Sequence, residues 1–374
     1  MNYDFNTGQN ILKESAHKLL GKECTSQFVR EMAKDETGFS IKLWDKMAEL
    51  GWMSLLIPEE YDGSGINFLD LSILLVEMGY YLMPGPFFST VVQGGLTVLE
   101  AGSDNQKADI LPDIANGKRK LTLAWIEEEG TYSPQGIKLK AECRDDGYIL
   151  TGSKLFVQDA QAADTIICAA RTSEGDNGLS LFLIDAKKSG IIIQPLNTMS
   201  GDKTFELRFE NVSVSKNDLL GDLNGAWPIL ETVLLKSAVA KSAEMTGGAE
   251  KVLEMVVDYA KGRKQFGKPI GAFQAIQHHC ADMLTYLDTM KYLMYQASWK
   301  ISENLPYESE AATCKAWSSD SYRKLTALGH QVIGGLGFME EYDLQLYFKH
   351  AKTSELMFGD ADFHREIVAQ KMEL

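Results

Sequence analysis

The spacing of apolar residues changes twice along this chain, and this change constrains the fold more than any other feature. Up to about residue 118 the apolar residues recur at helical intervals, as they do from Leu69 to Met78. Between about 120 and 222 they form short β-type runs separated by turn signals. From 223 onward the helical interval returns. A chain of 374 residues with this order is expected to form more than one domain.

We therefore predict an α+β multidomain protein. Its parts are a helical N-terminal domain (1–119), a central β-barrel or sandwich domain (120–222) and a C-terminal four-helix bundle (223–374). In the bundle, helical patterns cover 226–261, 271–302, 307–334 and 340–371. The N-terminal part contains the loop IPEEYDGSGIN, whose Gly63 and Gly65 suit a close backbone approach or a positive φ.

Composition argues against several classes of protein. The 52 acidic and 37 basic residues give a formal net charge of -15, which does not suit a broad nucleic-acid-binding or anionic-membrane-binding surface. The five cysteines are far apart in the sequence and form no CxxC motif, so we expect reduced thiols and no metal site. Neither a signal-peptide pattern nor a membrane-spanning apolar run occurs, and we expect a cytoplasmic protein.

Two segments of the C-terminal part suit a phosphate-bearing ligand. In RKQFGKPIGAFQAIQH, Arg263 offers a fork of donors, Phe266 a flat face and Gly267 a sharp reversal of the chain. In QVIGGLGFMEEY, Gly334 and Gly335 permit close approach and leave amide groups that can bind an anion. A plain helix connection explains the first segment and a helix C-cap explains the second, so neither identifies a ligand by itself.

Together, these two segments resemble the acyl-CoA dehydrogenase family. The N-terminal part resembles it in LGWMSLLIPEEYDGSGINFLDLSILLVEMGYYLMPGPFFST, and the central part in YILTGSKLFVQDAQAADTIICAAR and FELRFENVSV. The resemblance extends over nearly the whole chain. It implies a flavoprotein with a helical, a β and a helical domain. It also implies an oxidoreductase that acts on an acyl-CoA thioester and assembles as a homo- or hetero-oligomer, a dimer or a tetramer.

The resemblance implies FAD as the cofactor, bound between subunits. At the isoalloxazine ring, Phe156 keeps the aromatic cover that a family Trp supplies, and Gln158 replaces a hydroxyl residue. The acidic run from Glu127 to Glu129 is unusual there, and we expect a solvated loop rather than a catalytic role. The positions that match the arm holding the adenine and pyrophosphate all carry suitable residue types: Arg263, Gln265, Phe266, Gln274, Gln331, Gly334 and Gly335.

The reaction that the resemblance implies needs a desolvated carboxylate to remove the α-proton while hydride leaves the β-carbon for the flavin. Many members carry this Glu near the C-terminus, at the position of Phe358 here, and others carry it at the position of Ser237. Glu244 lies seven residues after Ser237, about two helical turns, and so projects from nearly the same face. Glu244 is therefore the candidate base, and a structural Glu within the bundle is the alternative.

The residues around Glu244 are small. Ala243, Gly247 and Gly248 are expected to admit a bulky acyl chain, and this context resembles two-gene heteromeric dehydrogenases that act on steroids. Ala238 stands where family members commonly carry an Arg that helps to bind CoA. Asp360 and Asp362 follow Phe358, but two residues along a helix rotate a side chain by about 200° and point it elsewhere.

These residues are consistent with two functions. The first is an active acyl-CoA dehydrogenase of lipid or steroid catabolism that uses Glu244 as the base and passes electrons to an electron-transfer flavoprotein. The second is a non-catalytic companion subunit that completes the FAD site of a related partner in a heteromeric dehydrogenase. A third possibility is reduction or a nitroalkane-like oxidation on the same scaffold.

Overall fold

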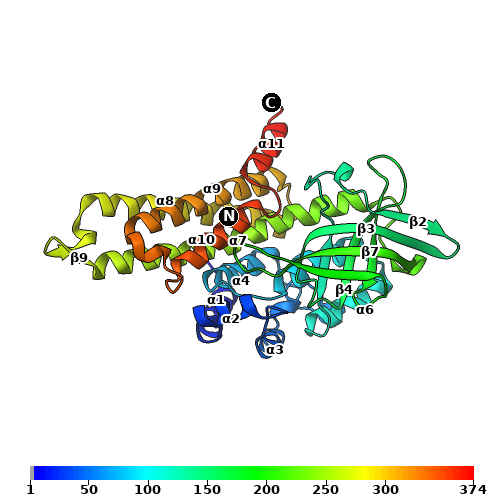
Figure 1. Cartoon of the computed structure of the whole chain (residues 1–374), viewed down its shortest axis with the longest axis horizontal. Coiled ribbons are helices and arrows are strands. Elements are labelled where there is room, and N and C mark those ends of the chain that lie inside the picture. The colour runs from blue at the N-terminus through cyan, green and yellow to red at the C-terminus, as the bar shows by residue number, and fades with distance from the viewer. Residues whose placement is uncertain (1–3) are drawn as a thin grey trace. The chain divides into compact units, whose positions relative to one another are not determined.

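The structure, a computed structural model, describes residues 4–374 and follows the predicted order of helices, sheet and helices (Figure 1). The first helices are α1 (Thr7–Glu23), α2 (Ser26–Lys34), α3 (Ile41–Glu49), α4 (Phe68–Tyr80), α5 (Leu96–Ala101) and α6 (Asp104–Ala115), with a π-helical stretch at Phe88–Gly95. The strands that follow are β1 (Leu121–Ala124), β2 (Lys140–Arg144), β3 (Gly147–Gln158), β4 (Thr165–Arg171), β5 (Leu179–Asp185), β6 (Ile191–Leu196), β7 (Thr204–Ser215) and β8 (Leu219–Leu220). The last part contains α7 (Ala226–Gly262), the short strands β9 (Lys264–Gln265) and β10 (Lys268–Pro269), then α8 (Gln274–Ser302), α9 (Glu308–Ile333), α10 (Leu344–Leu356) and α11 (Ala361–Lys371).

The described chain forms two compact units, each assembled from separated stretches of sequence. The helical unit contains the described residues up to Val29 together with Asn67–Met83 and Leu235–Leu374. The sheet unit contains Arg30–Ile66 and Pro84–Leu234. The three domain ranges 1–119, 120–222 and 223–374 stay a prediction. No helix within residues 4–374 is long and apolar enough to cross a membrane.

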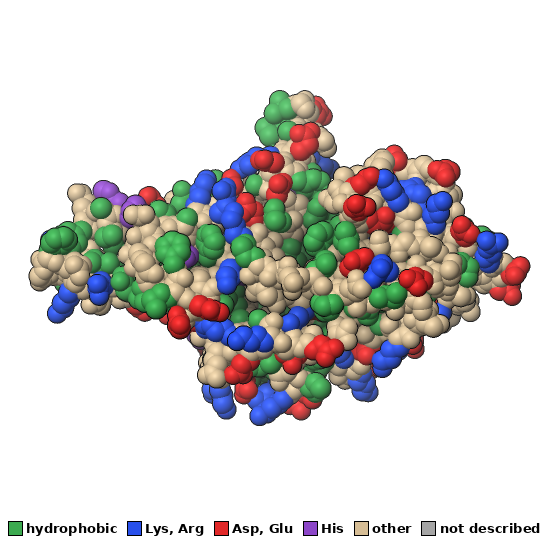
Figure 2. Space-filling model, viewed as in Figure 1, with side chains coloured by type: hydrophobic (Ala, Val, Ile, Leu, Met, Phe, Trp, Pro, Cys, Tyr) green, Lys and Arg blue, Asp and Glu red, His purple; other side chains and the backbone are tan. Residues whose placement is uncertain are grey.

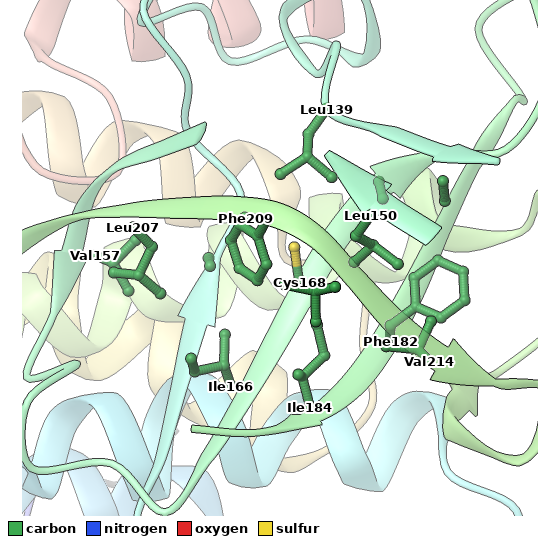
Figure 3. Close-up of a cluster of buried hydrophobic side chains, with 14 of the residues drawn as sticks. Leu139, Leu150, Val157, Ile166, Cys168, Phe182, Ile184, Leu207, Phe209 and Val214 are labelled. Carbon is green, nitrogen blue, oxygen red and sulfur yellow. The ribbon is translucent and has the colours of Figure 1, made fainter. Parts of the chain in front are cut away.

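The sheet unit is built around one mainly antiparallel sheet. Its strand order is β6-β7-β3-β2-β4-β5-β8, and β1 pairs in parallel with β4. Alternate residues of each strand face the core, as Phe205, Leu207 and Phe209 do on β7. They pack with Cys168 and Phe182 from β4 and β5 in a buried hydrophobic cluster, part of which Figure 3 shows. The β-type runs of the sequence therefore fold into the predicted β domain.

Two glycines of the sheet unit confirm the expectation for the IPEEYDGSGIN loop. A Cβ on Gly63 would lie 1.8 Å from the carbonyl oxygen of Ile57, so only glycine permits that close approach. Gly65 has a φ of +58°, in the left-handed region that side chains disfavour. The loop is thus fixed by its glycines in the two ways that the sequence predicted.

The helical unit packs α4 among the long C-terminal helices. Polar contacts fix α4 against α8, where Ser72 Oγ lies 2.8 Å from Ser298 Oγ and the Leu69 amide donates to Ser302 Oγ at 3.0 Å. The core joins apolar side chains of α7, α8, α9 and α10, among them Val252, Met290, Leu325, Leu344 and Tyr347. The helical pattern of the C-terminal part is thereby explained by burial of one face of each helix.

One predicted helix is wrong. The pattern over 340–371 is divided between α10 and α11 by a turn at residues 357–360. Phe358 and Gly359 both have positive φ, 59° and 92°, and two left-handed residues in succession cannot continue a helix. The Asp360 carboxylate then accepts the Phe363 amide at 2.9 Å and begins α11. The Gly-Asp pair was the sequence signal for this break.

Candidate functional site

The β9–β10 hairpin follows α7 and presents Phe266 to solvent. Phe266 and Gly267 form its two-residue turn with φ values of 53° and 79°, a conformation that glycine adopts easily and phenylalanine does not. The Phe266 side chain is 92% exposed. In an isolated chain this exposed ring buries no apolar surface, and its backbone conformation is strained. Both features are expected where the ring covers a ligand or a neighbouring subunit.

The glycine segment lies at the same end of the bundle. α9 ends at Ile333, Gly334 has a φ of +72°, and a Cβ on Gly334 or Gly335 would meet no atom within 4 Å. Ile333 belongs to the same buried cluster as Val256 of α7 and the partly buried Ile270 that follows the hairpin. Folding therefore brings the two ligand-binding segments of the sequence together, at the end of the bundle where exposed apolar side chains gather (Figures 1 and 2).

The side chains expected to hold FAD are available for a ligand. Arg263, Gln265, Gln274 and Gln331 are all exposed, and within residues 4–374 none of the four side chains makes a described hydrogen bond or ion pair. An unpaired guanidinium beside open glycine backbone matches an anionic pyrophosphate, and amide groups with an exposed aromatic ring match an adenine. The residues present at this end of the bundle thus fit the adenine and pyrophosphate part of FAD.

The sheet unit holds the residues expected at the isoalloxazine ring. Phe156 lies at a β-bulge of β3, where the register with β7 shifts between Lys154 and Val157, and it has a φ of 54° and an exposure of 57%. The side-chain oxygen of Gln158 is buried without a hydrogen-bond partner among the described residues. A buried acceptor without a donor is costly, and the N–H edge of a flavin ring would satisfy it. These residues also fit FAD.

The acidic run beside this site differs from its expectation. Glu128 and Glu129 are exposed, but Glu127 forms an ion pair of 2.6 Å with Lys154, whose side chain is fully buried. The Glu127 carboxylate also accepts the amides of Lys138 and Leu139, at 2.9 and 3.0 Å. The prediction of a solvated loop is therefore wrong for Glu127, which holds β3 to the segment after β1. No catalytic role is needed to explain it.

Glu244 lies on α7 in the interior of the helical unit. Its side chain is 13% exposed, and its Oε2 forms an ion pair with the ammonium of Lys241, which is 7% exposed. Ser237, two turns earlier, is fully buried, and its hydroxyl has no described partner. The carboxylate is thus largely removed from water, as the reaction requires of a base, but it has a cationic neighbour that sequence reasoning missed.

The small residues around Glu244 have a different role from the expected one. A Cβ on Gly247 would lie 1.8 Å from the Val76 carbonyl oxygen of α4, and a Cβ on Gly248 would lie 2.1 Å from the Tyr322 hydroxyl of α9. The space beside both glycines is therefore filled by neighbouring helices. The expectation that they make room for a bulky acyl chain is wrong, because close helix packing already uses that space.

Lys315 of α9 is a second buried cation that sequence reasoning missed. Its Nζ donates to the carbonyl oxygens of Gly359 (2.8 Å) and Glu355 (3.1 Å) and to the hydroxyl of Ser319 (2.9 Å). The pKa of the amine is lowered to about 7, mainly by burial; the nearby Asp360 opposes this change, and Lys241 adds to it. The available signal was a lysine within an apolar helical stripe, AATCKAW.

The turn at Phe358, where many family members carry the catalytic Glu, is held from two sides. Lys315 binds Gly359, and His364 Nε2 donates to the Phe358 carbonyl oxygen at 2.8 Å. The pKa of His364 falls to about 4, mainly because of burial and then because of Lys315. Phe358 itself is 6% exposed, and the Asp360 carboxylate is occupied as the cap of α11. The residue at the family position of the base is therefore apolar and cannot accept a proton.

Comparison with known proteins places these features in context. Three family models match successive parts of the chain: "Acyl-CoA dehydrogenase, N-terminal domain" over residues 6–118, "Acyl-CoA dehydrogenase, middle domain" over 122–212 and "Acyl-CoA dehydrogenase, C-terminal domain" over 224–373. The matches cover both the exposed hairpin at Phe266 and the glycine segment at Gly334.

Individual relatives are similar over their full lengths. A probable acyl-CoA dehydrogenase, YngJ, of Bacillus subtilis is 29% identical, with 100% of each chain covered. The caffeyl-CoA reductase-Etf complex subunit CarC of Acetobacterium woodii is 27% identical, with 98% of each chain covered. Among solved structures, a chain of the ChsE4-ChsE5 complex of Mycobacterium tuberculosis superposes with a TM-score of 0.90 at 25% identity, covering 100% of this chain and 99% of that chain.

Proposed function

The chain belongs to the acyl-CoA dehydrogenase family of FAD-containing oxidoreductases, and from that premise we propose that it dehydrogenates an acyl-CoA thioester between its α- and β-carbons. The observation that carries the proposal is Glu244, a mostly buried carboxylate with Oε2 paired to Lys241 and no described partner at Oε1. A desolvated carboxylate with one available oxygen is what abstraction of a weakly acidic α-proton requires.

In this proposal two groups of residues hold FAD. Arg263 and the amides of Gly334 and Gly335 would neutralise the pyrophosphate of the FAD in a neighbouring subunit, and Gln265, Phe266, Gln274 and Gln331 would hold the adenine end. Phe156 and Gln158 would hold the isoalloxazine part, Phe156 with its exposed ring and Gln158 with its unpaired side-chain oxygen. FAD, when bound, supplies the acceptor for the hydride that leaves the β-carbon.

Glu244 takes the α-proton at Oε1 as the hydride leaves. The C–H bond at the α-carbon breaks, an O–H bond forms on the carboxylate, and the released electron pair becomes the new carbon–carbon double bond. The side chain at the usual family position of the base, Phe358, cannot accept a proton and instead excludes water from its surroundings.

We further propose an electron-transfer flavoprotein as the partner that reoxidises the enzyme. The name of the Acetobacterium woodii relative places that protein in an Etf complex, which supports the same type of partner here. Because that relative is named a reductase, the direction of the reaction is part of the test: reduction of an enoyl-CoA uses the same residues in reverse, with Glu244 as the proton donor.

A second candidate function is a non-catalytic companion subunit in a hetero-oligomer. The observation that favours it is the Lys241 ammonium on the proposed base, together with an apolar Phe358 at the other family position. The ChsE4-ChsE5 relative is named as a complex of two proteins, which supports a heteromeric assembly. In this case the exposed Arg263 end of the bundle would complete the partner's FAD site.

The test is to express the chain alone and record its flavin absorbance, then to add a panel of straight-chain, branched and aryl acyl-CoAs under anaerobic conditions. Bleaching of the flavin supports the dehydrogenase. Oxidation of the reduced flavin by an enoyl-CoA supports the reductase. A colourless chain that gains flavin only on co-expression with a related subunit supports the companion.

Glu244→Gln separates the base from the binding site, because the amide keeps the shape but cannot take the proton. We expect it to retain FAD and to lose flavin reduction by at least about a hundredfold, the lower end of general-base contributions. The matched variant Glu254→Gln, on the same helix with a more exposed carboxylate, should reduce at the unmodified rate. Reduction at the unmodified rate in Glu244→Gln would refute Glu244 as the base.

A further inference from the structure

The ion pair between Lys241 and Glu244 is largely buried, as is that between Lys154 and Glu127. Lys241 and Glu244 are three apart on α7, and their side chains are 7% and 13% exposed. The same helix carries another Lys-Glu pair with the same spacing, Lys251 and Glu254, with side chains 29% and 46% exposed. Solvent screens the second pair strongly and the first pair little, so the Lys241 ammonium acts on its carboxylate with far greater effect.

The contact also selects one oxygen of the carboxylate. Lys241 Nζ donates to Oε2 of Glu244, and no described residue pairs with Oε1. On the α4 side, Gly79 packs directly on the Glu244 backbone, since a Cβ there would lie 1.9 Å from the Glu244 carbonyl oxygen. The backbone and one carboxylate oxygen are thus fixed, and the second oxygen remains for another partner.

Several charged groups lie near this ion pair on the helices packed against it. On α9, Lys315 is coupled electrostatically to Lys241, and its own pKa is lowered to about 7 by burial. Lys315 is coupled in turn to Asp360, Glu355 and Cys314, and it lowers the pKa of His364 on α11. On α4, Glu77 is paired with His17 and Tyr80 with Glu254, so these groups are already engaged.

We propose that Lys241 is a positioning residue for the base: its ammonium holds Glu244 through Oε2 and leaves Oε1 as the oxygen that receives the α-proton. This inference rests on the proposed function of Glu244. The ammonium contact fixes the Glu244 side chain in one orientation, and transfer of a proton to a general base depends on such a fixed geometry. Lys241 gives up no proton in the step; the α-proton moves to Oε1 only.

The test compares Lys241→Met, which removes the charge and keeps the length, with Lys241→Arg, which restores the charge. The first readout needs no substrate: Glu244 is followed at one pH by carbon NMR of labelled glutamate carboxyls in the FAD-loaded protein, with Glu244→Gln assigning the signal. In Lys241→Met we expect the narrow Glu244 signal to broaden or divide, because the side chain is no longer held in one orientation, and in Lys241→Arg to stay a single narrow line.

The second readout is the rate of flavin reduction at saturating acyl-CoA, with the acyl-CoA of the panel that reduces the unmodified protein fastest. This rate should fall by about tenfold or more in Lys241→Met and recover in Lys241→Arg, because a misplaced base oxygen slows proton transfer. Lys251→Met is the matched control and should leave the rate unchanged. A purely structural role would lower the melting temperature without changing the Glu244 signal or the rate of flavin reduction by the folded protein.

The outcomes separate the two proposals. An unchanged Glu244 signal in Lys241→Met overturns the role of Lys241, whatever residue is the base. A broadened signal together with full flavin reduction in Glu244→Gln shows that Lys241 holds Glu244 but overturns Glu244 as the base and the positioning role with it. A broadened signal and slower reduction in Lys241→Met, with loss of reduction in Glu244→Gln, support both proposals.

Discussion

The buried amine of Lys315 makes a quantitative prediction about stability and pH. Burial lowers its pKa from 10.5 to about 7, so the ammonium form is disfavoured in the folded protein. At about 1.4 kcal/mol for each pKa unit, this difference corresponds to about 5 kcal/mol between the charged form in the folded and in the unfolded chain. In the folded protein Nζ also donates to the Gly359 and Glu355 carbonyl oxygens.

Proton linkage gives the direction in which the free energy of unfolding changes with pH. Because the folded pKa lies below the unfolded one, the unfolded chain binds more protons between pH 7 and 10.5, and the free energy of unfolding rises with pH across this window. The stabilising contribution is complete above pH 10.5 and is lost as the pH falls toward 7. Lys315→Met has no such group, and its free energy of unfolding should lack this component at every pH.

The assay is chemical denaturation of both proteins at about pH 7 and about pH 9. The unmodified protein should gain about 2 kcal/mol more than Lys315→Met between these values, since part of the 7 to 10.5 window is covered. Burial raises the pKa of Cys24 and Cys168 to about 12, which gives an opposite slope as the pH rises, but both proteins share it. Any loss of the turn contacts in the variant is the same at both pH values. An equal pH response in the two proteins would refute a lowered pKa at Lys315.

Three other substitutions test the fold and the cofactor site. Arg263→Ala should weaken FAD retention by about 1.5 to 3 kcal/mol, the cost of a lost charge-assisted hydrogen bond, measured by flavin absorbance after dialysis. Gly247→Ala should lower the free energy of unfolding by about 1 to 3 kcal/mol, because the new Cβ would lie 1.8 Å from the Val76 carbonyl oxygen. Lys154→Met should cost about 3 to 5 kcal/mol in denaturation, since it leaves the Glu127 carboxylate without its buried partner.

Matched variants serve as controls for these three. Lys261→Ala, on the exposed last turn of α7, should leave FAD retention unchanged. Gly262→Ala introduces a Cβ with no atom within 4 Å and should leave stability nearly unchanged. Lys138→Met removes a mostly exposed partner of Glu129 and should cost less than about 1 kcal/mol. If a control changed as much as its test variant, the corresponding structural reason would be wrong.

The local pattern of apolar residues correctly predicted the order of helices, sheet and helices. The helical and β periods follow from which face of each segment is buried, and burial depends on residues two, three or four apart. Gly63 and Gly65 were readable for a similar reason, because backbone constraints at a glycine are local. The division of α10 from α11 was missed although Gly359 and Asp360 signal it, because the apolar spacing continues across the break.

For the candidate site, too, local features could be predicted and contacts between distant residues could not. The residue types of the FAD-binding segments and the absence of a carboxylate at Phe358 could be read directly, because they are properties of single positions. The pairing of Lys154 with Glu127, the filling of the space beside Gly247 and Gly248 by Val76 and Tyr322, and the contact of Lys315 with the turn after α10 became visible only in the folded chain. Each of these depends on partners distant in the sequence, and no periodicity encodes which buried charge meets which partner.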